Sequence, residues 1–366
     1  MTGEVAALTT EKTSILLPPG TRLLHIGPQK TGSTALQAAL HSARDTLLEH
    51  GVVYAGSDTR PRKAGWAVLG TTPRGRKSPD PSAWTRLVEE VREAGDARVL
   101  VSNEDFGRAD SSVAARIVRE LGQGQPHVVL VARRYDRLLP SQWQERVKAG
   151  EQLDYESWLR IVLDPAKAGR WRHRVVWSAH DTVASVERWA EHAGMENVTV
   201  IVADDADRAR IPDTFERLLG LPGGTLRLTP DTANRSLTFA ETELVRSVNG
   251  LFKKQGWTDE AYHRLVQGGL VMHLRTTAAA PEDIRIPPVP RWAADRVAEL
   301  NAARVDGLRQ SGVRVIGDLG ELTVNESSEE DIRPPVMISL AAASTAMEGT
   351  LRLAMKREKR LRQRLL

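Results

Sequence analysis

One lysine, two glycines and three hydroxyl residues occur within eight positions after the first apolar run of the chain. The segment reads His25-Ile-Gly-Pro-Gln-Lys-Thr-Gly-Ser-Thr-Ala-Leu-Gln37. Glycines allow a backbone to approach a bound group closely, and the free N–H groups at a helix start attract anions. Lys30 adds a mobile positive charge to the same loop. The spacing predicts a phosphate-binding turn between a strand and a helix.

The order of lysine and glycine in this loop differs from that of the Walker A motif. In Walker A the lysine directly follows the second glycine. Here Lys30 comes two positions before Gly32, and Ser33 follows that glycine. On the loop alone, an ordinary glycine-containing turn and a P-loop kinase with a degenerate motif both stay open.

An arginine and a serine form a second candidate anion grip. Arg133 follows the most apolar run, 128–132, and Ser141 comes eight positions later in the next predicted helix. Arginine gives a charge-assisted grip on phosphate, and a serine hydroxyl adds one more donor. A kinase for a simple nucleotide needs no second phosphate clamp, although a surface cap would also explain Arg133.

Together these motifs resemble the 5′-phosphosulfate loop and the 3′-phosphate site of sulfotransferases that use PAPS (3′-phosphoadenosine 5′-phosphosulfate), particularly bacterial members. Two further segments resemble the same family: a helix-turn-strand from Trp189 to Val202, and Asn234-Arg-Ser-Leu-Thr followed by a helix that reaches Asn249. The resemblance covers roughly residues 22–250. It implies sulfuryl transfer from PAPS to a hydroxyl or amine of a small-molecule or glycan acceptor, without a metal.

The resemblance also implies roles for individual residues. Lys30 would neutralise the charge that grows on the bridging oxygen as the sulfuryl group departs. The residues it assigns to the donor are Gln29, Lys30, Thr31, Gly32, Ser33, Thr34, Arg133, Ser141 and Arg235.

The general base is expected in the turn after residues 98–102. This turn contains no histidine, so the resemblance implies Glu104, which must take a proton from the acceptor. Asp105 is the competing carboxylate, and His180, expected in a polar loop, is the second choice. Glu104 could instead have a structural role, as a helix cap or in a salt bridge. His25 is expected to be a core residue.

Two other functions remain alternatives at this stage. A P-loop small-molecule kinase would use ATP and Mg²⁺ and would need an acidic residue at the end of a strand. A non-catalytic protein that binds a nucleotide or another anion would need only the loop and its charges.

Short apolar runs alternate with helical segments and predict an α/β fold. Strands are expected at 23–26, 52–54, 98–102, 128–132 and 198–202, with a late one at 313–316. This alternation favours a parallel sheet flanked by helices, followed by a mostly helical C-terminal part. The resemblance implies that this sheet has the P-loop NTPase-like sulfotransferase fold. Ligands bind at the carboxyl ends of such strands, where the loop, Glu104 and Arg133 are expected.

We predict three regions along the chain. Residues 1–20 form a disordered arm, 21–320 the α/β domain with its helical second half, and 321–366 an acidic linker and a basic terminal helix. A basic amphipathic helix could bind a partner or a membrane surface, or form a homo-oligomer, although a solvated helix end is the simpler interpretation. Residues 56–81 are expected to be a basic loop that could cover an anionic acceptor.

The composition limits the classes of function. The 366 residues carry a net charge of +4, which is too weak and dispersed for a nucleic-acid-binding stripe. Without cysteine there is no disulfide, thiolate metal site or cysteine nucleophile, and the nine histidines show no metal-ligand spacing. No signal-peptide pattern and no apolar stretch of about 20 residues occur, so we expect a cytoplasmic protein without stable membrane insertion.

Overall fold

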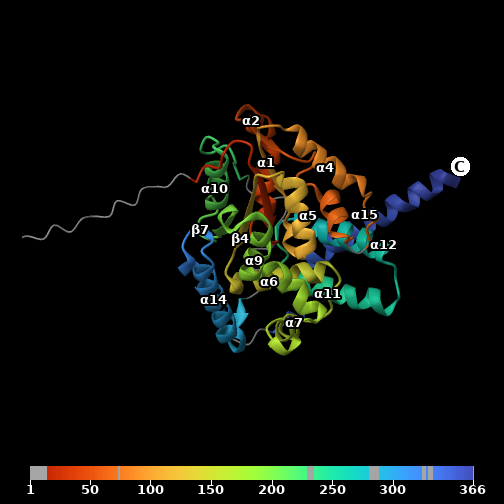
Figure 1. Cartoon of the computed structure of the whole chain (residues 1–366). Helices are drawn as coiled ribbons and strands as arrows, with labels where there is room; N and C mark the ends of the chain where they lie inside the picture. The colour runs from red at the N-terminus through yellow and green to blue at the C-terminus, as the bar shows by residue number, and fades with distance from the viewer. Residues whose placement is uncertain are drawn as a thin grey trace, which may run out of the picture.

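A six-stranded parallel sheet forms the centre of the protein (Figure 1). The computed structural model describes residues 15–72, 75–228, 235–279, 288–323, 327–328 and 333–365. Every neighbouring pair of strands in the sheet is parallel, which confirms the predicted α/β class. In spatial order the strands are β2 (Val52–Tyr54), β3 (Arg98–Ser102), β1 (Arg22–Gly27), β4 (Pro126–Ala132), β5 (Val198–Val202) and β7 (Arg314–Ile316).

Both faces of this sheet are covered by helices, which explains why its strands are apolar throughout. Alternate residues of a strand point to opposite faces. In β1, Leu24 and Ile26 join the core on one face, and Leu23 joins the core on the other. The first face is covered by α3 (Arg62–Leu69), α4 (Ser82–Glu93), α5 (Ser111–Gly122), α9 (Thr182–Ala193) and α14 (Arg291–Ser311). The second is covered by α1 (Ser33–Ser42), α2 (Arg44–Glu49) and α10 (Arg210–Leu219).

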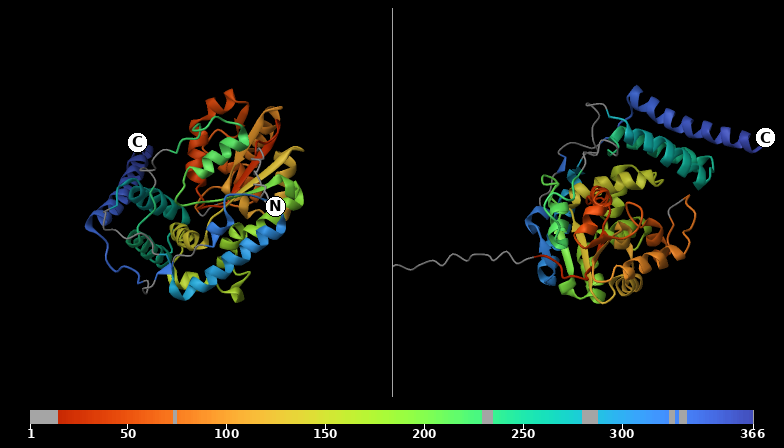
Figure 2. Two further views of the ribbon diagram at one scale, coloured as in Figure 1. Left: turned by 90° about the vertical axis from the view of Figure 1, so that its left-hand side faces the viewer. Right: turned by 90° about the horizontal axis from the view of Figure 1, so that it is seen from above.

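A separate helical core lies beside the sheet and is built around the buried aromatic residues Trp143, Tyr155 and Trp158. Its helices are α6 (Tyr135–Lys148), α7 (Tyr155–Val162), α8 (Trp171–His180), α11 (Phe239–Lys254), α12 (Asp259–Ala261), η4 (Tyr262–Val271), α13 (Met272–Thr276) and α15 (Leu340–Leu365). Figure 2 shows α15 running beside η4 and α13. Glycines permit this close approach, because a Cβ on Gly349 would lie 2.6 Å from the Gly269 carbonyl oxygen.

The structure corrects several predicted elements. The loop after β1 is followed by two helices that meet at Ala43, and His180, expected in a polar loop, belongs to helix α8. The basic loop expected at 56–81 contains α3. Gly65 lies inside that helix. A glycine is needed at this position because a Cβ there would come within 2.1 Å of Asn103 Nδ2. A glycine that looked like a loop signal therefore marks a close contact between α3 and the turn after β3.

Some sequence predictions fall outside the described residues. They concern most of the N-terminal arm (1–14), Asn234 and the acidic linker, so the three-region division remains a prediction. In the described parts of the chain, no helix combines the length and the apolar character needed to span a membrane.

Candidate functional site

The loop between β1 and α1 has the backbone geometry of an anion cradle. Lys30 and Gly32 both have positive φ angles, 69° and 98°, so the chain turns sharply before α1. The Thr31 hydroxyl donates to the Pro28 carbonyl oxygen at 2.7 Å and braces the turn from inside. No side chain caps the N-terminus of α1. The first N–H groups of a helix have no partner within the helix, so they can serve a ligand.

A pocket of about 440 Å³ lies at this helix end, and we call it the loop pocket. It brings together seven of the nine residues that the sequence assigned to the donor. These are Lys30, Gly32, Ser33, Thr34, Arg133, Ser141 and Arg235. Of the other two, Gln29 lines a different cleft and Thr31 is buried within the loop.

Arg133 joins the loop to the end of the next strand. Its guanidinium donates to the Lys30 carbonyl oxygen at 3.1 Å and to Asp205 Oδ1 at 2.6 Å. Its Nε is buried and has no hydrogen-bond partner among the described residues. Arg133 is therefore held at the mouth of the loop pocket by two contacts of its terminal nitrogen atoms.

Ser141 and Arg235 differ in how much of their bonding capacity is free. The Ser141 hydroxyl makes no hydrogen bond to any residue that the structure describes. Arg235 instead makes a two-pronged contact with Glu241, at 2.8 and 2.6 Å, and Glu241 belongs to the capping box of α11. Arg235 lines the pocket, but much of its charge already stabilises the start of α11.

A partly buried triad of charges connects the loop to α6. Lys30 Nζ lies 3.1 Å from Glu145 Oε1, and Lys148 Nζ lies 2.5 Å from the same oxygen. Burial raises the pKa of Glu145, but the two adjacent ammonium groups outweigh this and hold the pKa well below its usual range. Burial lowers the pKa of Lys148 to about 8, against the opposing attraction of Glu145.

A second and larger cleft, of about 930 Å³, adjoins the loop pocket. We call it the arginine cleft. Lys148 and Arg275 line both cavities, and Glu145, the partner of Lys30, lines the cleft. A ligand in one cavity would therefore share charged neighbours with a ligand in the other.

Glu104 lies directly against the loop, at the start of the turn after β3. A Cβ added to Gly27 would come within 2.6 Å of Glu104 Cβ, so only glycine fits there. The carboxylate of Glu104 accepts from Gln37 Nε2 at 2.7 Å and forms an ion pair with Arg60. Glu104 is 8% exposed and does not line either cavity, although Arg60 lines the arginine cleft.

Asp105, the competing carboxylate, does line the arginine cleft. It accepts from Gln29 Nε2 at 2.8 Å and from Trp66 Nε1 at 3.3 Å. Both carboxylates of this turn are therefore anchored next to the loop, one inside the protein and one in the cleft wall.

The two histidines considered from the sequence are both core residues. His180 was expected in a polar loop, but it is the last residue of α8, is 3% exposed and lines neither cavity. Burial, with a smaller effect of Arg108, lowers its pKa to about 3, so it is neutral at physiological pH. His25 bonds Ser102 Oγ at 2.8 Å inside the sheet, as its position on the strand predicted.

Sequence reasoning missed Glu145, Lys148 and Arg275. The first two could have been found, because they follow Ser141 by four and seven residues and so share one face of α6. Arg275 comes from α13, far along the chain, and no local pattern connects it with the loop.

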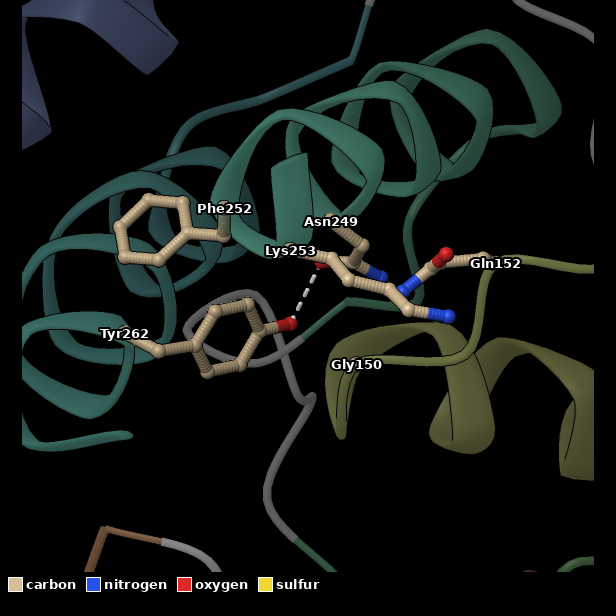
Figure 3. A pocket seen from close by; sticks show the side chains of 6 residues that line it. All are labelled: Gly150, Gln152, Asn249, Phe252, Lys253 and Tyr262. Carbon is tan, nitrogen blue, oxygen red and sulfur yellow. Dashed lines mark hydrogen bonds between the residues drawn. The ribbon is translucent and has the colours of Figure 1, made fainter. Parts of the chain in front are cut away.

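Another hollow, of about 280 Å³, lies between α11 and η4 (Figure 3). Two of the residues that line it are already paired: Tyr262 Oη donates to Asn249 Oδ1 at 2.7 Å, and Asn249 Nδ2 donates to backbone carbonyl groups. None of the predicted site residues lines it. Across the described residues, no cluster of three or more histidine, aspartate or glutamate side chains could hold a metal ion.

Comparison with known proteins gives little independent guidance. No family model and no curated protein matches the sequence. Among solved structures, a sulfotransferase from Alicyclobacillus acidocaldarius is similar, with 17% identity and a TM-score of 0.38 over 67% of this chain and 99% of that one. A match this loose carries no argument about the reaction, which has to be inferred from the residues of the site.

Proposed function

We propose that the protein transfers a sulfuryl group from PAPS to a hydroxyl or amine of an acceptor. One observation carries the proposal: residues from two separate segments line a single pocket that offers two anion grips. The loop and α1 supply Lys30 with Ser33 and Thr34, and the β4–α6 region supplies Arg133 and Ser141. A donor with phosphate groups at two separate positions fits such a pocket better than a donor with a single phosphate chain.

The donor set also agrees with this class of ligand. The loop pocket is lined by seven arginine and lysine side chains and by one acidic residue, Asp136. The hydroxyl of Ser141, which has no partner among the described residues, is a further donor for a phosphate oxygen. Hydrogen bonds from the charged side chains to phosphate are stronger than hydrogen bonds between neutral groups. The cations can thus supply the countercharge that Mg²⁺ provides in kinases.

PAPS would supply the sulfuryl group, with PAP (3′,5′-bisphosphoadenosine) as the leaving group. In the transfer, a bond forms between the acceptor oxygen or nitrogen and sulfur, and the bond from sulfur to the bridging phosphate oxygen breaks. Lys30 stabilises the negative charge that develops on that bridging oxygen. Ser33, Thr34 and the amides of α1 hold the 5′-phosphate, and Arg133 with Ser141 holds the 3′-phosphate.

Glu104 is our choice for the general base that takes the acceptor proton. It adjoins the loop at Gly27, and its carboxylate is oriented by contacts with Gln37 and Arg60. Asp105 is the alternative because it already lines the arginine cleft, where the acceptor would enter. A cytoplasmic location and self-association through α15 remain predictions from the sequence.

Lys148 should make donor binding depend on pH. Its pKa of about 8 in the free protein means that it is charged at neutral pH and loses its proton above pH 8. PAP favours the ammonium form, so its Kd should rise by up to about tenfold per pH unit above pH 8, where the phosphate groups of PAP are already fully ionised. Calorimetric titration of PAP from pH 7 to 10 measures this. In Lys148→Arg, which stays charged, the rise should disappear; an identical rise in that variant would contradict the assignment to Lys148.

Turnover of PAPS labelled in the sulfuryl group, over a panel of phenols, sugars and amines that includes members with and without a carboxylate, phosphate or sulfate group, tests the proposed function. An acceptor-dependent labelled product supports it and excludes a purely binding role. If purified protein that binds PAP yields no product with any acceptor class, the transferase assignment is wrong.

A further inference from the structure

The arginine cleft carries far more positive charge than its own acids neutralise. Seven arginine and lysine side chains line it, against three aspartate and glutamate side chains. Two of the acids are also already engaged. Asp105 accepts from Gln29 and Trp66, and Glu145 is shared between Lys30 and Lys148.

Arg146 is the clearest case in this cleft of a charged side chain that has no direct partner among the described residues. Its side chain makes no hydrogen bond or ion pair with any residue in the described parts of the chain, and its Nε is buried. The nearby Arg108 donates to the neutral amide of Gln29, but its Nε is buried without a partner and its contact with Asp105, at 3.7 Å, is loose. Burial, followed by repulsion from Arg108, lowers the pKa of Arg146 to about 10, so it remains charged at neutral pH. Two like charges held near each other in a partly buried cleft favour an anion between them.

The sulfuryl donor does not account for these two arginines. Neither Arg108 nor Arg146 lines the loop pocket, whereas Lys148 and Arg275 line both cavities. The charge of Arg108 and Arg146 is therefore additional to the charge that serves the donor.

The cleft also has an apolar flank next to its charges. Trp66, Leu69, Val271 and Met272 line it together with the arginines. An indole face can stack on a flat ring or on the apolar face of a sugar. The cleft thus offers a cationic anchor and a surface for an adjoining ring.

We infer that the acceptor is itself an anion: a hydroxyl or amine compound with a carboxylate, phosphate or sulfate group held by Arg146 and Arg108. This inference rests on the proposed function for the transfer step that comes after binding. It deepens that function, because it removes neutral phenols, alcohols and unmodified sugars from the preferred acceptors. The acid group anchors the molecule in the arginine cleft, and its hydroxyl or amine lies toward the turn that carries Glu104 and Asp105.

Matched pairs of acids and neutral amides test the inference by calorimetry on the PAP-saturated protein. The probes are 4-hydroxybenzoate with 4-hydroxybenzamide, and glucuronate with glucuronamide. Within a pair only the charge changes, so at least one acid should bind about tenfold more tightly than its amide. The preference should fall at high salt, because screening weakens the contact.

Arg146→Gln should abolish the preference for the acid. Since the Arg146 side chain has no internal partner, this change breaks no polar contact of the fold, and Arg108→Gln serves as a second, independent variant. The same substitution at Arg119, which is 68% exposed on α5, should leave the preference unchanged. Equal binding of acids and amides, no binding of any probe, or a preference that survives both cleft variants would overturn the inference.

The same titrations separate this inference from the proposed function. A protein that binds the acids through Arg146 but does not bind PAP contradicts the sulfotransferase proposal and leaves the anion site in place. A protein that binds PAP but does not distinguish acid from amide contradicts only the anionic acceptor.

Discussion

Replacing Lys30 with methionine is expected to lower kcat for sulfuryl transfer by about 10²–10³-fold, the usual cost of removing one preorganised group that stabilises developing charge. Methionine keeps much of the length of the side chain but not its charge. Lys30 also lines the loop pocket, but five arginines line it as well and keep it strongly positive, so the Kd for PAP should change by less than about tenfold. Single-turnover transfer from labelled PAPS measures the first effect and calorimetry the second.

The Lys30 variant needs a control for charge alone. Lys167→Met, in a short helical turn outside both cavities, removes the same charge and should leave kcat unchanged. If Lys30→Met transfers as fast as the wild type, the loop binds the donor without stabilising the departing oxygen.

Glu104→Gln is expected to reduce kcat by about 10²–10⁴-fold, the range that a general base contributes. Because Glu104 lies outside the loop pocket, the Kd for PAP should not change. The glutamine can still accept from Gln37 but loses its ion pair with Arg60, so the melting temperature must be measured alongside.

Asp105→Asn is the matched control for the base, because Asp105 is the adjacent carboxylate and its asparagine can keep the contact with Gln29. The assignment to Glu104 requires the larger loss in the Glu104 variant. If the Asp105 variant loses transfer and the Glu104 variant keeps it, Asp105 is the base and Glu104 has only a structural role through Arg60.

The sheet and the phosphate loop could be predicted because both are local in the sequence. Each central strand is a short apolar run, and the carboxyl ends of parallel strands meet at one edge. The loop after β1, Glu104 after β3 and Arg133 after β4 were therefore expected to lie near one another. The structure places Gly27 against Glu104, and Arg133 against the Lys30 carbonyl group.

Features that depend on contacts between distant segments could not be predicted in this way. Gly65 indicates a loop by its residue type, yet it lies inside α3. The glycine is required there because Asn103, almost 40 residues later, lies against it. The role of Arg275 depends on how α13 is placed beside the sheet, and that placement comes from the helical core. The burial of His180 has the same origin, because it results from the position of α8.

The central claim is that the loop and Arg133 together bind a nucleotide with two separate phosphate groups and no metal. Calorimetric titration of PAP in the presence of EDTA tests it most directly, with ATP and Mg²⁺ as the competitor. We expect PAP to bind without metal, ATP with Mg²⁺ to compete poorly, and Arg133→Ala to weaken PAP binding by about a hundredfold. Arg119→Ala, far from both cavities, should have no effect. A preference for ATP with Mg²⁺, or PAP binding that does not depend on Arg133, would contradict this claim.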